Sequence, residues 1–167
     1  MHNKSNYIVQ GALIAALYVI LTIFSNLFGL ASGIIQVRLS EALTVLPIFI
    51  PAAVPGLFVG CLIANVLTGC ALLDIILGAL ATLVGAYGTL LIGRHKPHSR
   101  LGNSLASIPP ILVNTLVIPP ILAFVYNFEG SIIYFASNVF IGELISAGLL
   151  GQLLLKALVP YKDKIGF

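Results

Sequence analysis

The chain has 167 residues, of which 59% are hydrophobic and 8% are charged, and its mean hydropathy is +1.12. A soluble domain carries about 25% charged residues. The composition therefore excludes a soluble enzyme or ATPase domain and predicts an all-α integral membrane protein surrounded by lipid. The net charge of +3 does not indicate a nucleic-acid partner.

Six apolar segments follow one another along the chain, each near or somewhat below the ~17–25 residues that a membrane-spanning helix needs. They cover residues 7–28, 40–50, 56–70, 73–93, 105–126 and 132–158. The first is longer than the ~7–15-residue core of a signal peptide and predicts a retained span. Residues 1–167 are thus expected to form a single transmembrane domain, a bundle of six helices.

The second segment is too short to cross a membrane alone. Pro47, Pro51 and Pro55 flank or interrupt it, and each lacks the N–H that a regular helix uses. We expect the second and third segments to form a bent hairpin with its turn at residues 51–56. Cys61 and Cys70 both lie in the third segment, a spacing that indicates neither a metal site nor a disulfide framework.

Basic residues gather on one side of the predicted topology. If the N-terminus is inside, the inner side holds seven basic residues and one acidic residue: Lys4, Arg94, Lys96, Arg100, Lys156, Lys162, Lys164 and Asp163. The outer side holds Arg38, Glu41, Asp74 and Glu129. Cytoplasmic loops carry an excess of Lys and Arg, so this distribution predicts that both termini are cytoplasmic.

Small residues recur at helical spacing in several segments, a pattern that lets helices approach closely in lipid. In the third and fourth segments we interpret these stripes as internal packing. They comprise Gly56, Gly60, Ala64 and Thr68, and Gly78, Ala81, Thr82, Gly85 and Thr89. The first segment carries Gly11, Ala12, Ala15 and Ala16 near its inner end. As a terminal helix it is suited to docking another protein, with oligomerisation as the alternative.

Polar groups stand out in such an apolar chain, because a charge near the bilayer centre costs ~2.5–3.5 kcal/mol on insertion scales. Asp74 begins the fourth segment, and a helix-capping role explains this residue as well as a role in a ligand site does. Glu41 is explained by a cap or by pairing with Arg38 at i, i+3. Glu143 is different, since it lies mid-span with no cationic residue at its depth.

Asn114 lies at a similar depth in the fifth segment, and Asn138 lies in the outer third of the last one. A short distance after Asn114, the pair Pro119 and Pro120 frees helix carbonyls, which is tolerated at membrane depth beside a cavity. The polar residues together predict a pocket open to the outside. It suits a ligand that is cationic or rich in N–H donors.

Three long motifs resemble the queuosine-precursor transporter family, QueT. They are QVRLSEALTVLP at residues 36–47, PAAVPGLFVGCLIAN at 51–65 and DIILGALATL at 74–83. Members of that family are substrate-binding S-components of energy-coupling factor transporters. The resemblance implies a six-helix subunit of the prokaryotic plasma membrane that captures substrate from outside and topples to deliver it. Its implied partners are a transmembrane coupling subunit and two ATPases, which use the ATP, so no cofactor is expected in this chain.

The resemblance also implies residue roles. Family members dock through small residues that match Ala12 and Ala16 here, with Gly11 and Ala15 beside them, and their first outer loop, here about 29–40, gates the site. The implied substrates are 7-deazaguanines: preQ1, preQ0 or queuine.

Within the predicted pocket, Glu143 would accept the N–H groups of the base and Asn114 would donate to its carbonyl. Glu41 or Asp74 would hold an amine, and Arg38 would orient Glu41 or latch the loop. The stacking aromatic would be Phe49, Phe135 or Tyr134.

Two other functions remain open from the sequence. The first is a stand-alone proton-coupled transporter in which Glu143 titrates. The second, a small intramembrane enzyme, is less favoured because His2, His95 and His98 all map to the inner face, away from the pocket.

Overall fold

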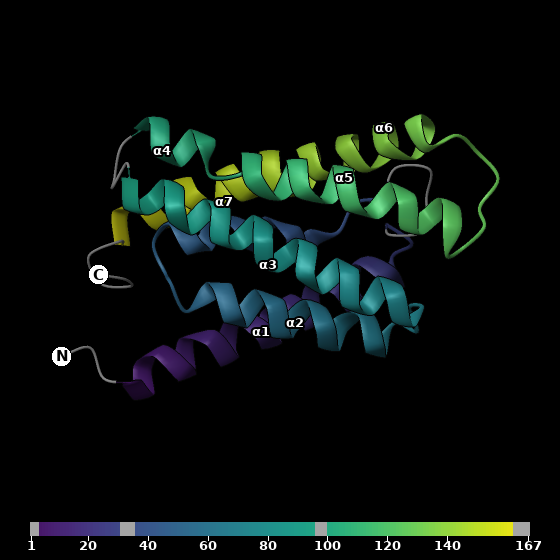
Figure 1. The fold of residues 1–167 in the computed structure, drawn as a ribbon. Helices are drawn as coiled ribbons and strands as arrows, with labels where there is room; N and C mark the ends of the chain where they lie inside the picture. Colours follow the sequence, from purple (N-terminus) through teal and green to yellow (C-terminus); the bar gives the residue numbers. More distant parts are fainter. Residues whose placement is uncertain (1–3, 31–35, 96–99, 162–167) are drawn as a thin grey trace.

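The computed structural model describes residues 4–30, 36–95 and 100–161. Within them every regular element is helical and no strand is present, so the all-α prediction is confirmed (Figure 1). The elements are α1 (Lys4–Leu27), η1 (Leu39–Ile48), α2 (Ala53–Leu67), α3 (Leu72–His95), α4 (Arg100–Leu105), α5 (Ile108–Phe124), α6 (Ile132–Glu143), η2 (Leu144–Leu150), α7 (Gly151–Leu158) and η3 (Val159–Tyr161).

Four described stretches are long and apolar enough to cross a membrane: Ser5–Leu27, Leu72–His95, Leu101–Phe124 and Ile132–Tyr161. The protein is therefore a multi-pass membrane protein. The two remaining apolar helices, η1 and α2, are shorter than a bilayer requires. A count of six spans stays a prediction.

The turn predicted at residues 51–56 is wrong in its second half. The chain turns between Phe49 and Ala52, and α2 already begins at Ala53. Pro55 sits in the first turn of α2, where a missing N–H leaves no helical hydrogen bond unmade. By the same rule Pro109 and Pro110 stand in the first turn of α5.

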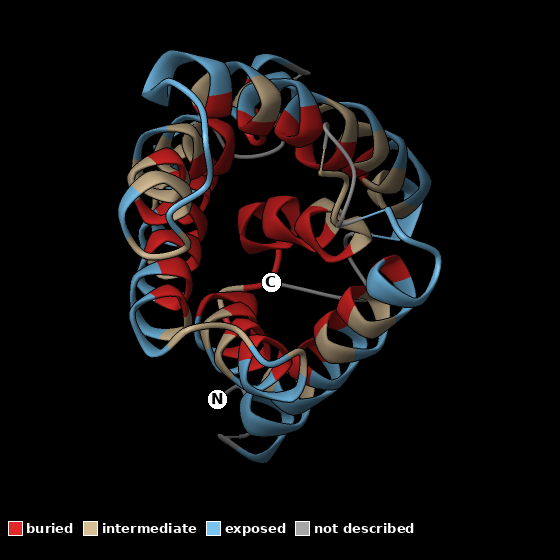
Figure 2. Cartoon of the chain, turned by 90° about the vertical axis from the view of Figure 1, so that its right-hand side faces the viewer, coloured by how far each residue is buried: buried red, intermediate tan, exposed pale blue. Residues whose placement is uncertain are grey.

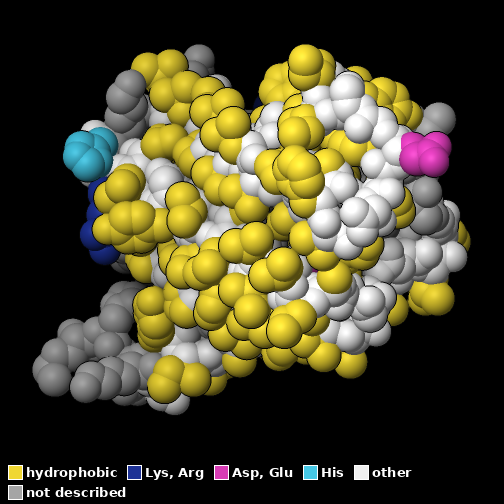
Figure 3. All heavy atoms as spheres, turned by 45° about the vertical axis from the view of Figure 1, so that its right-hand side comes forward, with side chains coloured by type: hydrophobic (Ala, Val, Ile, Leu, Met, Phe, Trp, Pro, Cys, Tyr) yellow, Lys and Arg dark blue, Asp and Glu magenta, His cyan; other side chains and the backbone are white. Residues whose placement is uncertain are grey.

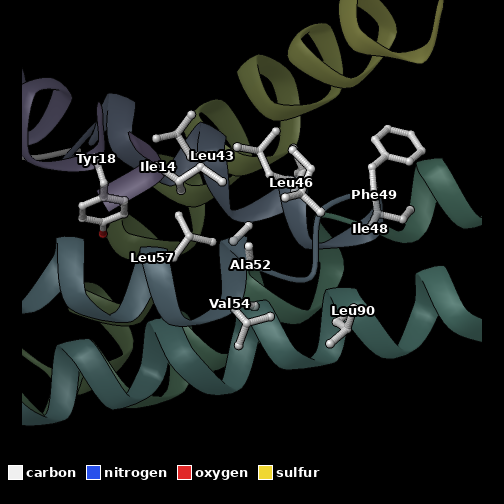
Figure 4. Close-up of a cluster of buried hydrophobic side chains, with 14 of the residues drawn as sticks. Ile14, Tyr18, Leu43, Leu46, Ile48, Phe49, Ala52, Val54, Leu57 and Leu90 are labelled. Carbon is white, nitrogen blue, oxygen red and sulfur yellow. The ribbon is translucent and has the colours of Figure 1, made fainter. Parts of the chain in front are cut away.

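The 3₁₀ helix η1 forms the centre of the bundle. It packs against α1, α2, α3, α7 and η2, and most of its residues are buried. Figure 2 shows a largely buried helix enclosed by the outer helices. Leu43 and Leu46 of η1 join Ile14 and Leu57 in the main apolar cluster (Figure 4). This helix therefore lies at the centre of the core, and its neighbours pack around it.

Helices α1 and α2 cross with almost no side chain between them. A Cβ on Gly56 would lie 2.5 Å from the carbonyl oxygen of Gly11, and one on Gly60 would lie 2.9 Å from that of Ala15. Only glycine permits such backbone contact. The small-residue stripe of the third predicted segment is therefore internal packing, as expected.

Charged side chains separate towards the two ends of the bundle. Arg94 and His95 end α3 and Lys156 lies in the last turn of α7, while Glu129 lies in the α5–α6 loop. Figure 3 shows basic side chains at one end and an acidic side chain at the other. The other charged residues of the predicted inner side, Lys96, Lys162, Asp163 and Lys164, lie outside the described residues, as do His2, His98 and the side chains of Lys4 and Arg100. The cytoplasmic location of both termini stays a prediction.

Candidate functional site

Three buried polar side chains from distant parts of the chain meet in an inner cavity of about 30 Å³. Glu41 comes from η1, Asn114 from the middle of α5 and Glu143 from the last residue of α6. Each is at least nine-tenths buried. The cavity is lined by Gln36, Arg38, Glu41, Cys61, Gly78, Thr82, Asn114, Ile118, Val139 and Glu143.

Asn114 joins the two carboxylates. Its Nδ2 donates to Oε1 of Glu143 over 2.8 Å and lies 3.4 Å from Oε2 of Glu41. The hydroxyl of Tyr18 donates to Oε1 of Glu41. Both oxygens of Glu41 thus have donors, whereas the buried Oε2 of Glu143 has no hydrogen-bond partner among the described residues. Glu143 retains one acceptor for a ligand.

A polar stripe on α1 fixes the start of η1 and so the position of Glu41. Thr22 Oγ1 donates to Ser40 Oγ over 2.8 Å, and the backbone N–H of Leu39 donates to Ser25 Oγ over 2.9 Å. With Tyr18, these hydroxyls recur at the helical spacing of three and four residues. The stripe replaces a conventional side-chain cap, which η1 lacks.

Glu143 lies at a change of helix type. The α-helix α6 ends there, and η2 continues the chain as a π-helix. Such segments are rare and often found at functional sites. Just before it, Gly142 lies so close to Gln36 that a Cβ would overlap the Gln36 carbonyl oxygen. This contact holds residues 36–38 over the inner cavity.

A second cavity of about 190 Å³, here called the outer cavity, adjoins the first at the end of the bundle that carries the α5–α6 loop and shares Gln36 and Arg38 with it. Asp74 of α3 is its buried carboxylate, and Tyr126 donates a 2.8 Å hydrogen bond to Asp74 Oδ2. The same hydroxyl accepts the N–H of Ala71 over 3.1 Å. Desolvation and the Asp74 carboxylate raise the pKa of Tyr126, so the phenol stays protonated as a donor.

The structure divides the residues predicted for the pocket. Arg38, Glu41, Asn114 and Glu143 share the inner cavity. Asp74 belongs to the outer one, and half-buried Asn138 lines neither.

The structure also bears on the helix-cap and charge-pair explanations offered for Glu41 and Asp74. Glu41 accepts its side-chain hydrogen bonds from Tyr18 and Asn114, and the guanidinium of Arg38 interacts with it electrostatically. Asp74 lies in the first turn of α3, where the helix dipole favours it, and also bonds Tyr126.

The proposed stacking aromatics lie elsewhere. Phe49 is in the apolar core at the end of η1, while Phe135 and Tyr134 line neither cavity. Tyr126 and Phe128 instead line the outer cavity, with ring centroids 5.6 Å apart. An aromatic residue in a loop next to a site gives no periodic signal, which is why the sequence did not single these out.

Residues 7–16 of α1 show two different faces. Gly11 and Ala15 lie against α2, whereas Ala12 and Ala16 are exposed. An apolar groove of about 310 Å³ runs beside them. It is lined by Tyr7, Ile8, Gly11, Ala12, Ala15, Pro55, Gly56 and Val59.

Comparison with known proteins identifies the chain's relatives. Residues 8–160 match the family described as QueT transporter. Over 95 residues the chain is 40% identical to a protein of Lactococcus lactis subsp. cremoris (strain MG1363) named "Queuosine precursor transporter QueT". That alignment covers 56% of each chain, so it spans little more than half of the relative's length. No solved structure matches. Because the family match covers nearly all of the described helices, the chain belongs to the QueT transporter family.

Proposed function

We propose that this protein is the substrate-binding S-component of an energy-coupling factor transporter in the cell membrane and imports a queuosine precursor, a 7-deazaguanine. The observation that carries the proposal is the buried Oε2 of Glu143, an acceptor without a partner in the described residues. This oxygen belongs to a carboxylate that also bonds Asn114. The chain that carries it belongs to a transporter family. An enzymatic function has no support from that family.

A deazaguanine base presents N1–H and an exocyclic amine side by side. The Glu143 carboxylate accepts both, and each charge-assisted hydrogen bond contributes about 1.5–3 kcal/mol. Asn114, which bonds Glu143 in this structure, turns its N–H towards the base carbonyl. Glu41 is held by Tyr18 and keeps Asn114 in place.

Binding requires the inner cavity to open. Its volume of about 30 Å³ has room for one or two water molecules, not for a fused bicyclic base. Residues 36–38 form the wall that it shares with the outer cavity. Displacement of this segment admits the base, and its return to Gly142 closes the enlarged cavity over the bound base, in keeping with a gating role for the first outer loop. Residues 31–35 of that loop lie outside the described residues.

The groove beside α1 suits a partner helix. Ala12 and Ala16 are exposed and their side chains are single methyl groups, so a helix of the transmembrane coupling subunit can approach α1 closely. The groove's apolar lining agrees with an occupant that is also in the membrane. The partner ATPases then supply the energy for toppling, and this chain needs no cofactor of its own.

A stand-alone proton-coupled transporter remains the second candidate, because Glu143 is a buried carboxylate deep in a predicted span. The two functions separate in proteoliposomes that contain only this chain. Uptake driven by a pH gradient favours the second function, whereas binding without uptake favours the first.

The test of the substrate is binding by calorimetry, preceded by mass spectrometry of the small molecule that co-purifies. We expect Glu143→Gln to abolish deazaguanine binding, since the amide keeps one acceptor oxygen and replaces the other with an NH2 group that faces an N–H donor of the base. Wild-type affinity in a folded Glu143→Gln protein would remove this carboxylate from the site. The matched control is Glu129→Gln, an exposed loop carboxylate, which should leave affinity unchanged.

A further inference from the structure

The inner cavity holds more negative than positive groups. Its lining contains two carboxylates, Glu41 and Glu143, and one guanidinium, Arg38. The charge of Arg38 also acts on Asp74 in the outer cavity, so it is divided among three carboxylates. Both inner carboxylates are at least nine-tenths buried. Two ionised carboxylates in one poorly solvated site repel each other strongly, and such a pair holds a proton that an isolated carboxylate loses.

Asn114 brings the two inner carboxylates together. Its Nδ2 lies 2.8 Å from Oε1 of Glu143 and 3.4 Å from Oε2 of Glu41, so a single nitrogen atom separates them. The two sides of this bridge are unequal. Glu41 accepts from Tyr18 at its other oxygen, whereas the other oxygen of Glu143 is buried without a hydrogen-bond partner among the described residues. Donors stabilise an ionised carboxylate, so this arrangement favours the negative charge on Glu41 and the proton on Glu143.

We propose that Glu143 is protonated in the free protein and releases this proton to solvent when the base binds. This inference rests on the proposed function. The step breaks the O–H bond of the Glu143 carboxyl group, leaves the electron pair on the carboxylate and transfers the proton to water or buffer. The base enters without a change in its own protonation. Binding is therefore an exchange of one proton for one neutral base.

The edge of the base requires the ionised form of Glu143. N1–H and the exocyclic amine both donate, so the group that faces them must accept twice. A protonated carboxyl offers one acceptor oxygen and one O–H donor, and that donor would face an N–H group of the base. Glu41 does not take up the proton, because Tyr18 and Asn114 already donate to its two oxygens. The proton therefore leaves the site.

The other titratable and charged groups around the two glutamates retain their protonation states. Among the described residues they are Tyr18 of α1, Arg38 before η1, Cys61 of α2 and Asp74 of α3. Tyr18 keeps its proton as the donor to Glu41, and the guanidinium stays charged. A buried thiol away from cationic helix ends stays neutral. Asp74 lines the outer cavity and accepts a hydrogen bond from Tyr126, which favours its ionised form.

Calorimetry counts the released proton directly. The full chain in detergent is titrated with unsubstituted 7-deazaguanine, which has no amine arm, in phosphate and in Tris at the same pH. These buffers differ in ionisation enthalpy, so the difference between the two observed binding enthalpies gives the number of protons released. We expect about one proton per base at about pH 7. Because the free protein must lose a proton, affinity should rise with pH, by up to about tenfold per unit.

Glu41→Gln tests the part that the second carboxylate has in this exchange. The variant removes the rival charge, so Glu143 is ionised beside Arg38 in the free protein and most of the proton release should disappear. Thermal melting checks that the variant is folded. The matched control is Glu129→Gln, an exposed loop carboxylate, which should release the same number of protons as the wild type.

Binding of the base to the wild type without proton release, or with an affinity that stays constant over about pH 6 to 8, would overturn the inference. Undiminished release in a folded Glu41→Gln protein would also overturn it. If that variant does not fold, the proton count of the wild type still decides. If 7-deazaguanine does not bind the wild type at all, the proposed function itself fails.

Discussion

Gly142→Ala tests whether residues 36–38 close over the ligand. The added methyl group would overlap the carbonyl oxygen of Gln36 and lie 3.1 Å from its carbonyl carbon. Carbon atoms pack best at about 3.5–4.0 Å, so the carbon–carbon contact alone requires the Gln36 peptide to retreat by roughly 0.4–0.9 Å, and the overlap with the oxygen requires more. Overpacking of this kind costs about 1–3 kcal/mol.

That cost falls on the closed arrangement alone, because the open one removes Gln36 from Gly142. A penalty of about 1–3 kcal/mol shifts the equilibrium between the two by roughly 5- to 150-fold. We therefore expect Gly142→Ala to weaken deazaguanine binding by that factor. Most of the change should appear as faster dissociation, which stopped-flow displacement of the bound ligand measures.

Gly148→Ala is the matched control on the same stretch of chain. There the nearest atoms to an added Cβ lie 3.7 Å away, an ordinary contact, and alanine favours a helix over glycine. This variant should bind like the wild type and melt at the same or a higher temperature. Equal dissociation rates for wild type and Gly142→Ala would refute the closure of residues 36–38 over the site.

Two further variants, one of them paired with a control, test the positioning of the site and the docking face. Tyr18→Phe removes a buried donor from Glu41 and should cost about 1–3 kcal/mol in unfolding free energy or ligand affinity, measured by thermal melting and calorimetry. Tyr134→Phe, at an exposed phenol, should change neither. Replacing Ala12 and Ala16 with leucine should block co-purification with the coupling module and leave ligand affinity intact. Recovery of the module by the double variant would place the docking face elsewhere.

The sequence predicted the membrane helices well because the bilayer imposes a simple rule. Every segment long enough to span it must be apolar and helical, so composition alone marks the elements. The rule fails for short internal helices such as η1 and α2. Their ends depend on packing, and Pro55, a predicted turn residue, belongs to the first turn of α2.

The site was predictable in part for a related reason. Polar groups in lipid must face inward and find one another, and Glu41, Asn114 and Glu143 do so. Their distribution over two cavities was not predictable, because it depends on the path of residues 36–38. Tyr18 was also missed, although it stands in a periodic stripe of hydroxyls.

The different roles of the two inner glutamates follow from how their oxygens are occupied. Tyr18 and Asn114 supply donors to both oxygens of Glu41, so a ligand gains little by replacing them. Glu143 keeps one buried oxygen without a partner in the described residues, and such a group costs about 1–3 kcal/mol.

A ligand that donates to this oxygen removes that cost in addition to forming its own bond. The full gain goes to a molecule that reaches Glu143 with an N–H group. Water entering the cavity recovers part of it. Specificity therefore depends on a second donor placed beside the first, which a guanine-like edge supplies and a single water molecule does not.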